Sequence, residues 1–188
     1  MKIVLAGGTG FIGRALVRRL IERGEDVVLL SRRSAPGPSQ NPRLLTEVWD
    51  GRSAGAWARH AEGANALINL AGEPIAAGRW TKAQKEKILA SRVDATRAFV
   101  EAIKNATPMD GGSAAGGHGW PERPKPRTPV FLNASAVGYY GNVPAGDVTE
   151  AHPQGPGFLA ETCARWEQAA LVASSLTRLV LLRIGVVL

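Results

Sequence analysis

The sequence is poor in cysteine and aromatic residues and has no long apolar run. Cys163 is the only cysteine among 188 residues, which excludes an internal disulfide and suits a reducing compartment. No segment approaches the roughly 20 consecutive apolar residues of a membrane span. The first apolar run starts at Ile3 and leaves no room for a signal peptide. We therefore expect a cytoplasmic protein that does not enter a membrane.

Histidine is scarce too, and basic residues do not gather into a run. The histidines, His60, His118 and His152, are too scattered for metal-ligand spacing, so we predict no metal site. The formal net charge is +7, but no basic run is interleaved with aromatic residues and no nucleic-acid motif occurs. Many lysines and arginines fall on helix faces that should be solvated, so we expect no nucleic-acid partner.

What is present is a glycine-rich turn, Gly7–Gly13 (GGTGFIG), directly after the apolar run Ile3–Ala6 and before an amphipathic segment. A buried strand, a glycine turn and a helix in this order are the context that a dinucleotide-binding fingerprint requires. Gly7 permits the tight turn, Gly10 lets backbone N–H groups approach a pyrophosphate, and Gly13 lets the helix pack closely on its strand. The helix N-terminus adds a favourable dipole. The predicted phosphate contacts are Gly7, Thr9, Gly10, Phe11, Ile12 and Gly13.

The end of the second apolar run indicates which dinucleotide is preferred. After Val27–Leu30 come Ser31, Arg32 and Arg33, where an acidic residue would bind the ribose 2′-hydroxyl of NAD. Guanidinium groups match a phosphate bidentately, so this triplet predicts a preference for NADP(H), with NAD(H) the less favoured cofactor. The alternative is that both arginines only solvate a loop.

Strand and helix patterns alternate along the chain, which is typical of a parallel doubly wound sheet. We predict one α/β domain over residues 1–188, a three-layer αβα NAD(P)-binding Rossmann fold. Thr81 and Gln84 form a predicted capping box for a helix that extends to about Ala106, with a break near Ser91 as an option. The Gly- and Pro-rich segment 107–128 is predicted to be a mobile surface insertion. The predicted strands are 3–6, 27–30, 44–49, 66–70, 130–133 and 179–184, and the shorter predicted helices are 12–23, 54–61 and 159–170.

These segments resemble the extended short-chain dehydrogenase/reductases of the NAD-dependent epimerase/dehydratase superfamily. Gly7–Gly13 resembles the superfamily's phosphate loop, Asn69–Gly72 its turn beside the nicotinamide ribose, Asn133–Ala136 with Tyr140-Gly141 its "SSA…YG" segment, and Leu182–Gly185 its "LRxG". The runs NLAGEPI (69–75), RW (79–80), SR (91–92) and AVGYYG (136–141) are similar to an atypical branch of "epimerase family proteins" that bind NADP(H). The resemblance implies further cofactor contacts from Leu70, Ala71, Gly72, Ala134 and Ile184.

The last predicted helix departs from that superfamily. Its members use a Tyr-x-x-x-Lys pair, in which lysine lowers the tyrosine pKa and holds the nicotinamide ribose. Here Phe158 and Thr162, or Leu159 and Cys163 after a shift of one residue, stand at that spacing, and no lysine follows Lys125. The candidate substitutes are Ser135, Tyr139, Tyr140 and Glu161. Their alternative roles are a backbone hydrogen bond for Ser135 and aromatic packing for the tyrosines.

Four other residues each have two interpretations. Asp50, by resemblance, accepts from the adenine amino group, or it is a turn or cap residue. Trp80, with Arg79, shapes a pocket near the nicotinamide, or packs as a hydrophobic staple. Arg92 reaches a phosphate or the substrate, or is a solvated helix arginine. Cys163 is interpreted as a core thiol in preference to a nucleophile, because no histidine or basic residue is near it in sequence.

The sequence therefore predicts an NADP(H)-binding oxidoreductase or epimerase acting on a small carbonyl or hydroxyl compound. The alternative is a non-catalytic NADP(H) sensor or interaction protein that has lost the Tyr-Lys pair. The chain ends in the apolar run Leu179–Leu188, from which we expect a longer protein with a C-terminal substrate-binding portion. Neither the substrate nor the oligomeric state follows from the sequence.

Overall fold

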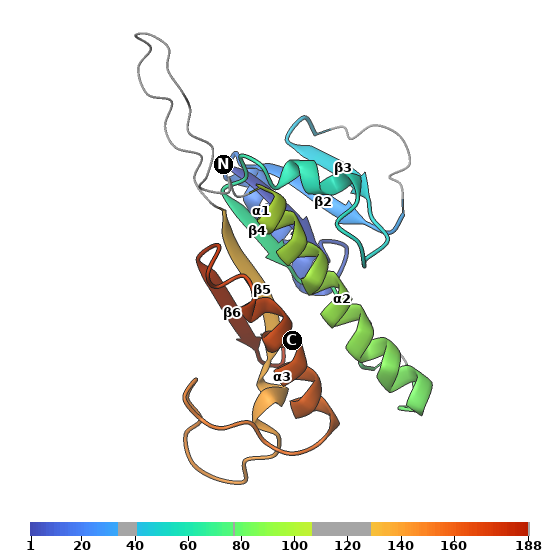
Figure 1. The fold of residues 1–188 in the computed structure, drawn as a ribbon, viewed down its shortest axis with the longest axis vertical. Coiled ribbons are helices and arrows are strands. Elements are labelled where there is room, and N and C mark those ends of the chain that lie inside the picture. Colours follow the sequence, from blue (N-terminus) through green and yellow to red (C-terminus); the bar gives the residue numbers. More distant parts are fainter. Residues whose placement is uncertain (34–40, 77, 107–128, 188) are drawn as a thin grey trace.

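A parallel sheet with helices on both faces forms the molecule (Figure 1). The computed structural model describes residues 1–33, 41–76, 78–106 and 129–187. Within them the six strands have the order β3-β2-β1-β4-β5-β6, and all neighbouring strands are parallel. The chain thus starts in the middle of the sheet, builds outward to β3, and then crosses β1 to build the other half. The strands are β1 (Lys2–Ala6), β2 (Asp26–Ser31), β3 (Leu44–Val48), β4 (Ala66–Asn69), β5 (Val130–Ala136) and β6 (Leu179–Ile184).

The helices divide into one on the first face of the sheet and the rest on the second. Helix α1 (Phe11–Glu22) packs on the first face. Helices α2 (Lys82–Ala106) and α3 (Phe158–Leu171), with the short 3₁₀ helix η1 (Ala56–His60), pack on the second. A further 3₁₀ turn, η2 (Val137–Tyr140), follows β5 directly. This arrangement confirms the doubly wound, three-layer fold that the alternating pattern predicts.

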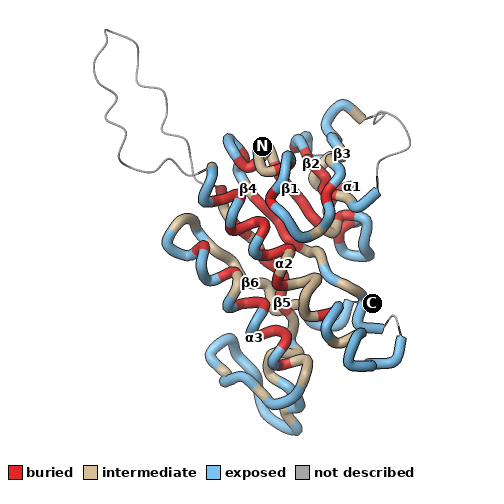
Figure 2. The backbone as a smooth tube through the Cα atoms, turned by 45° about the vertical axis from the view of Figure 1, so that its right-hand side comes forward, coloured by how far each residue is buried: buried red, intermediate tan, exposed pale blue. Residues whose placement is uncertain are grey.

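Alternate side chains of the strands supply two hydrophobic cores. In β1, Ile3 and Leu5 face α1, whereas Val4 and Ala6 face α2 and its neighbours. Because both faces are covered, the strand is buried along nearly its whole length, as expected of a central parallel strand. Buried residues accordingly follow the sheet and the inner sides of the helices, and exposed residues the outer surface (Figure 2).

Helix α2 differs in two respects from the prediction. It continues without interruption through Ser91, whose hydroxyl donates to Ile88 O inside the helix (3.0 Å). Only half of the capping box forms. The Gln84 N–H donates to Thr81 Oγ1 (3.2 Å), but the Thr81 N–H donates to Arg79 O (2.9 Å) and is therefore not capped by Gln84. The helix positions predicted to face the core, Ile88, Ala95, Phe99 and Ile103, are buried.

The remaining boundaries agree with the prediction to within a few residues, and β5 is longer than predicted because it runs on to Ala136. The predicted insertion 107–128 lies outside the described residues, and so do residues 34–40 between β2 and β3. Over the part of the chain that is described, no helix is long and apolar enough to cross a membrane.

A buried polar network joins the ends of β4 and β5 to both large helices. Asn69 Nδ2 donates to Asn133 Oδ1 (2.8 Å) and to Thr96 Oγ1 (3.1 Å). Thr96 Oγ1 donates to Asn133 Oδ1 (3.1 Å) and accepts from Trp166 Nε1 (2.9 Å). Asn69, Asn133 and Thr96 are fully buried. Because each polar atom has a partner, the network fixes the spacing of β4, β5, α2 and α3.

Replacing Thr96 by valine is expected to lower the free energy of unfolding by about 2 kcal/mol, because the buried Trp166 N–H loses the one acceptor it has among the described residues. The matched control is Thr162→Val on α3. Within the described structure the buried Thr162 Oγ1 has no hydrogen-bond partner, so its loss should be neutral or slightly stabilising. Urea unfolding of both variants measures the difference, and equal destabilisation would contradict the role given to the network.

Candidate functional site

The glycine-rich turn between β1 and α1 can only be built from glycine at its first and last positions. Gly7 has φ +79°, and a Cβ there would lie 2.6 Å from the backbone C and O of Leu70. A Cβ on Gly13 would collide with Gly7 O and lie 2.6 Å from Gly8 Cα. The turn therefore contacts the end of β4 on one side and the first turn of α1 on the other, with no room for a side chain at either contact.

The N–H of Gly10 donates to Gly7 O (3.0 Å), but the N–H groups that follow it, of Phe11 and Ile12, have no acceptor among the described residues. Gly10 is the N-cap of α1 in an extended conformation, and no side chain caps the helix. The first N–H groups of a helix lack an intrahelical acceptor, and here no acidic residue occupies the first turn. The residues around them, Thr9, Phe11 and Ile12, are exposed. This is an open cradle of N–H groups at the positive end of a helix dipole, which suits a phosphate group.

The predicted cofactor residues line the carboxyl edge of the sheet. The ends of β2, β1, β4, β5 and β6 lie in that order, because the strands are parallel and neighbouring. The turn after β1 lies in the middle of the edge, with Ser31 at the end of β2 on one side. On the other side, Leu70, Ala71 and Gly72 follow β4. Ala134 lies near the end of β5, and Ile184 ends β6 opposite Ala136.

Arg32 and Arg33 follow β2 and are exposed. The Arg33 N–H donates to Ser31 Oγ (3.2 Å), which turns the chain at this point. Neither arginine is paired with a carboxylate of the described residues, so both guanidinium groups remain available at the β2 end of the edge. Both arginines lie at the end of β2, as the sequence predicts, and their contact with a phosphate stays a prediction.

Asp50 is held in a turn. Its Oδ1 accepts from the N–H groups of Arg52 (2.8 Å) and Ser53 (2.9 Å), and its Oδ2 accepts from Ser53 Oγ (2.8 Å). The Ser53 N–H bond is the main cause that lowers the pKa of Asp50. The structure thus shows the turn role for this residue. Contact with an adenine amino group stays a prediction.

Arg92 is not the solvated helix arginine of the second interpretation. Its Nη1 donates to Glu73 O and Ile88 O (both 3.0 Å), and its Cζ lies 5.2 Å from the centre of the Trp166 ring. A Cβ on Gly72 would lie 3.1 Å from Cζ, so the guanidinium lies directly against the Gly72 backbone. Burial lowers the pKa of this side chain. Arg92 is therefore a half-buried cation at the end of β4.

Ser135 belongs to a buried ion-pair network between the sheet and α3. Its hydroxyl donates to Glu167 Oε1 (2.5 Å), and Arg183 of β6 donates to both oxygens of Glu167 (2.9 Å each). The Glu167 bond raises the pKa of Arg183 further above its usual value. The predicted alternative for Ser135 was a backbone bond, and the structure instead shows a carboxylate. Since Ser135 is 3% exposed and its proton is used by Glu167, its hydroxyl is poorly placed to donate to a substrate.

The two tyrosines of η2 contact the same arginine. Arg183 Nη1 donates to the Tyr140 hydroxyl (2.8 Å), and Cζ of Arg183 lies 3.7 Å from the centre of the Tyr139 ring. The rings meet edge to face, with centroids 5.4 Å apart. Tyr140 accepts a charge-assisted bond, whereas Tyr139 supplies mainly a stacking surface. The arginine and glutamate of this network were missed in the sequence. An "LR" at the end of a strand, with a helix glutamate predicted to be buried, is the signal that could have found them.

Cys163 is a buried thiol, as the sequence predicts. It is 5% exposed on the inner face of α3, and burial is the main cause that raises its pKa. A protonated thiol is a poor nucleophile. Glu161, the remaining candidate from the sequence, is exposed in the first turn of α3. The described residues contain no group of three or more His, Cys, Asp or Glu that could hold a metal ion.

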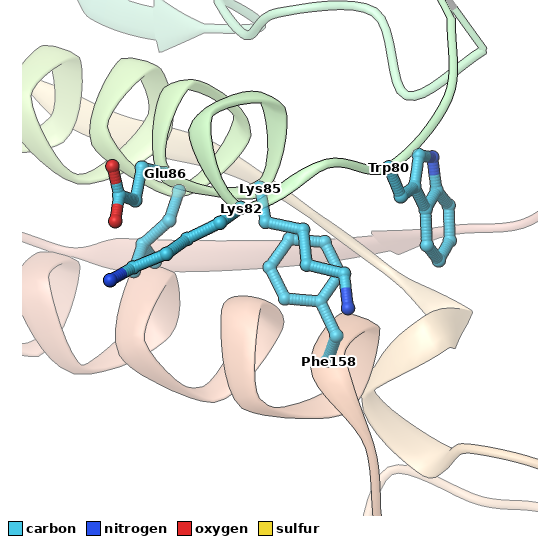
Figure 3. A pocket seen from close by; sticks show the side chains of 6 residues that line it. Trp80, Lys82, Lys85, Glu86 and Phe158 are labelled. Atoms are coloured by element: carbon cyan, nitrogen blue, oxygen red, sulfur yellow. The ribbon is translucent and has the colours of Figure 1, made fainter.

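A pocket of about 350 Å³ lies between the first turns of α2 and α3 (Figure 3). Trp80, from the loop before α2, packs edge to face on Phe158 with ring centroids 5.6 Å apart, and its Nε1 donates to Ile75 O (2.8 Å). Lys85 Nζ lies 5.2 Å from the Phe158 ring centre. Trp80 therefore lines a pocket, and Phe158 is a wall of it. That this pocket lies near the nicotinamide stays a prediction.

The fold and the glycine turn define an NAD(P)-binding Rossmann-type α/β protein. Comparison with known proteins agrees, because residues 3–187 match the NAD dependent epimerase/dehydratase family. The chain belongs to this family.

Similar proteins extend the match along the whole chain. The chain is 35% identical over 188 residues to the epimerase family protein SDR39U1 homolog, chloroplastic, of Arabidopsis thaliana. The match covers 100% of this chain and 49% of that protein. It resembles the crystal structure of human epimerase family protein SDR39U1 with NADPH (TM-score 0.72, 30% identity, 100% of this chain and 55% of that one). The dTDP-glucose 4,6-dehydratase DesIV of Streptomyces venezuelae shares the fold (TM-score 0.73, 22% identity, 97% and 55% covered). The chain thus spans about half the length of the relatives it matches, and the predicted "epimerase family protein" branch is confirmed.

Proposed function

We propose that this chain binds a nicotinamide dinucleotide, NADP(H) in preference to NAD(H), along the carboxyl edge of its sheet. The observation that carries the proposal is the turn Gly7–Gly13, in which glycine is required at both ends and the N–H groups of Phe11 and Ile12 have no acceptor among the described residues. The human relative, 30% identical, was crystallised with NADPH, which supports the same ligand here.

The strand order supports a direction for each half of such a ligand. With its pyrophosphate on the turn after β1, the adenosine half extends toward β2 and β3, where Arg32, Arg33 and Asp50 lie. The nicotinamide half extends toward β4 and β5, past Leu70, Ala71, Gly72 and Ala134. Two exposed arginines and no acidic residue follow Ser31, and this arrangement favours a 2′-phosphate over a 2′-hydroxyl.

We infer further that the chain is the cofactor half of an oxidoreductase or epimerase for a small carbonyl or hydroxyl compound. When bound, the nicotinamide supplies or accepts the hydride. The coupled proton must come from a side chain, and the Tyr-x-x-x-Lys pair is absent. Among Ser135, Tyr139 and Tyr140, we assign the proton to Tyr140. Its hydroxyl accepts from Arg183 and can donate its own proton to a substrate oxygen, whereas the hydroxyl of Ser135 is bonded to Glu167.

Oxidation of NADPH by the full-length protein, followed by absorbance with a panel of aldehydes, ketones and keto-sugar nucleotides, tests this function. We expect turnover with at least one compound, and a loss of about 100-fold in turnover for Tyr140→Phe with unchanged NADPH affinity. Tyr139→Phe is the matched control and should retain turnover. NADPH binding without turnover of any compound would favour the non-catalytic sensor.

A further inference from the structure

Arg92 is a half-buried cation that forms no salt bridge within the described structure, and the Glu73 carboxylate acts on it only from beyond salt-bridge distance. Its only hydrogen-bond acceptors there are the neutral carbonyls of Glu73 and Ile88, both bonded to Nη1. One face of the guanidinium lies against the Gly72 backbone, and Trp166 flanks it. A guanidinium also carries donors on Nη2 and Nε, and no acceptor among the described residues is bonded to them.

Burying the Arg92 guanidinium without a salt bridge costs free energy, which a purely structural role does not explain. A charge loses hydration when it is buried, and a carboxylate partner normally offsets that loss. The other partly buried arginine at this edge, Arg183, has such a partner in Glu167. Arg92 has no carboxylate within salt-bridge distance among the described residues, and burial is the main cause that lowers its pKa, against a smaller opposing effect of the Glu73 carboxylate. Its remaining donors lie beside exposed Gly72, at the rim of the proposed dinucleotide site.

The position of Arg92 along the edge selects one half of the ligand. Gly7 of the phosphate-binding turn abuts Leu70 and Ala71, and the next residue, Gly72, abuts Arg92. Arg92 therefore lies across the end of β4 from the turn, away from the β2 end where Arg32 and Arg33 lie. It also lies against Trp166 of α3, with Cζ 5.2 Å from the centre of that ring.

The geometry points to Arg92 as the residue that binds the nicotinamide half of the dinucleotide, through oxygen atoms of its ribose or adjoining phosphate. This assignment rests on the proposed function. The helix that carries Phe158 and Cys163 supplies no lysine, and Arg92 brings a cation to the same region from α2. The free Nη2 and Nε donors are the bonding groups, while the Nη1 bonds to Glu73 O and Ile88 O hold the guanidinium in place.

The Arg92→Met variant tests this assignment. Its dissociation constants for NADPH, NADH and 2′,5′-ADP can be measured by competition fluorescence. We expect affinity for both dinucleotides to fall by the same factor, about 10- to 100-fold, because charge-assisted bonds are lost. Affinity for 2′,5′-ADP, which contains only the adenosine half, should not change. The matched control is Arg97→Met, an exposed arginine of the same helix, and it should leave all three constants unchanged.

Thermal unfolding of the free variant separates binding from a structural role. Loss of a ligand-binding cation that forms no salt bridge should leave the melting temperature within a few degrees of the parent. If Arg92→Met does not fold, Arg92→Lys provides the test, since lysine keeps the charge but lacks the planar fork, and both dinucleotides should still bind more weakly. Unchanged dinucleotide affinity, or an equal loss for 2′,5′-ADP, overturns the assignment. Failure of the parent chain to bind NADPH at all overturns the proposed function itself.

Discussion

Replacing Gly13 by alanine is expected to abolish measurable binding of NADPH and NADH alike. The added Cβ would collide with Gly7 O and come within 2.6 Å of Gly8 Cα, both of which are backbone atoms that cannot rotate away. Helix α1 would have to move off the turn, and its N–H groups would no longer converge on a phosphate. Because a pyrophosphate is common to both dinucleotides, the affinity for each should fall by about 100-fold or more.

The other end of the same helix provides the control for this variant. Gly24 has φ +77°, and a Cβ there would meet nothing within 4 Å, so Gly24→Ala adds backbone strain without a collision. It should lower the free energy of unfolding by roughly 1 kcal/mol and leave both dissociation constants unchanged. Isothermal titration of the two variants makes the comparison. Retained binding by a folded Gly13→Ala variant would show that the turn does not hold the phosphates.

Replacing Arg32 and Arg33 together by alanine is expected to weaken NADPH binding by about 100-fold or more and to leave NADH binding nearly unchanged. Each guanidinium would contribute a charge-assisted hydrogen bond to the 2′-phosphate, worth roughly 1.5–3 kcal/mol. NADH has no such phosphate, so its affinity does not depend on these residues. The preference between the two dinucleotides should therefore disappear.

A variant with the same change in net charge separates specific contacts from general electrostatics. Arg97 of α2 and Arg165 of α3 are both exposed and lie away from the β2 end of the sheet. Their double replacement by alanine should alter both affinities less than twofold at about 0.15 M salt, because charges beyond a Debye length of about 8 Å are largely screened. Equal weakening of NADPH and NADH by Arg32→Ala/Arg33→Ala would contradict the 2′-phosphate assignment.

Most of the architecture could be predicted from local patterns. The apolar runs that became β1, β2 and β4 are continuous because both faces of these strands are covered. The glycine spacing of the first turn also has a local cause, since backbone conformation and close contact both demand glycine there. Secondary-structure boundaries were less certain: β5 was predicted too short because Ala134–Ala136 carry no strongly apolar side chains.

The electrostatic part of the site could not be predicted, because it depends on contacts between distant segments. Arg92 looks like any helix arginine until the fold brings Gly72 and Trp166 against it. Ser135 resembles a catalytic serine until Glu167 of α3 and Arg183 of β6 meet behind it. Periodicity along α3 can place Glu167 on the buried face, but its pairing with Ser135 and Arg183 follows only from three-dimensional packing.

The proposed function requires that the backbone of the turn Gly7–Gly13 holds a dinucleotide. Isothermal titration of the intact 188-residue chain with NADPH and then NADH tests this most directly. We expect saturable one-to-one binding of both dinucleotides, with NADPH bound more tightly than NADH. A folded chain that gives no heat of binding with either dinucleotide, and no displacement by 2′,5′-ADP in a competition assay, would contradict it.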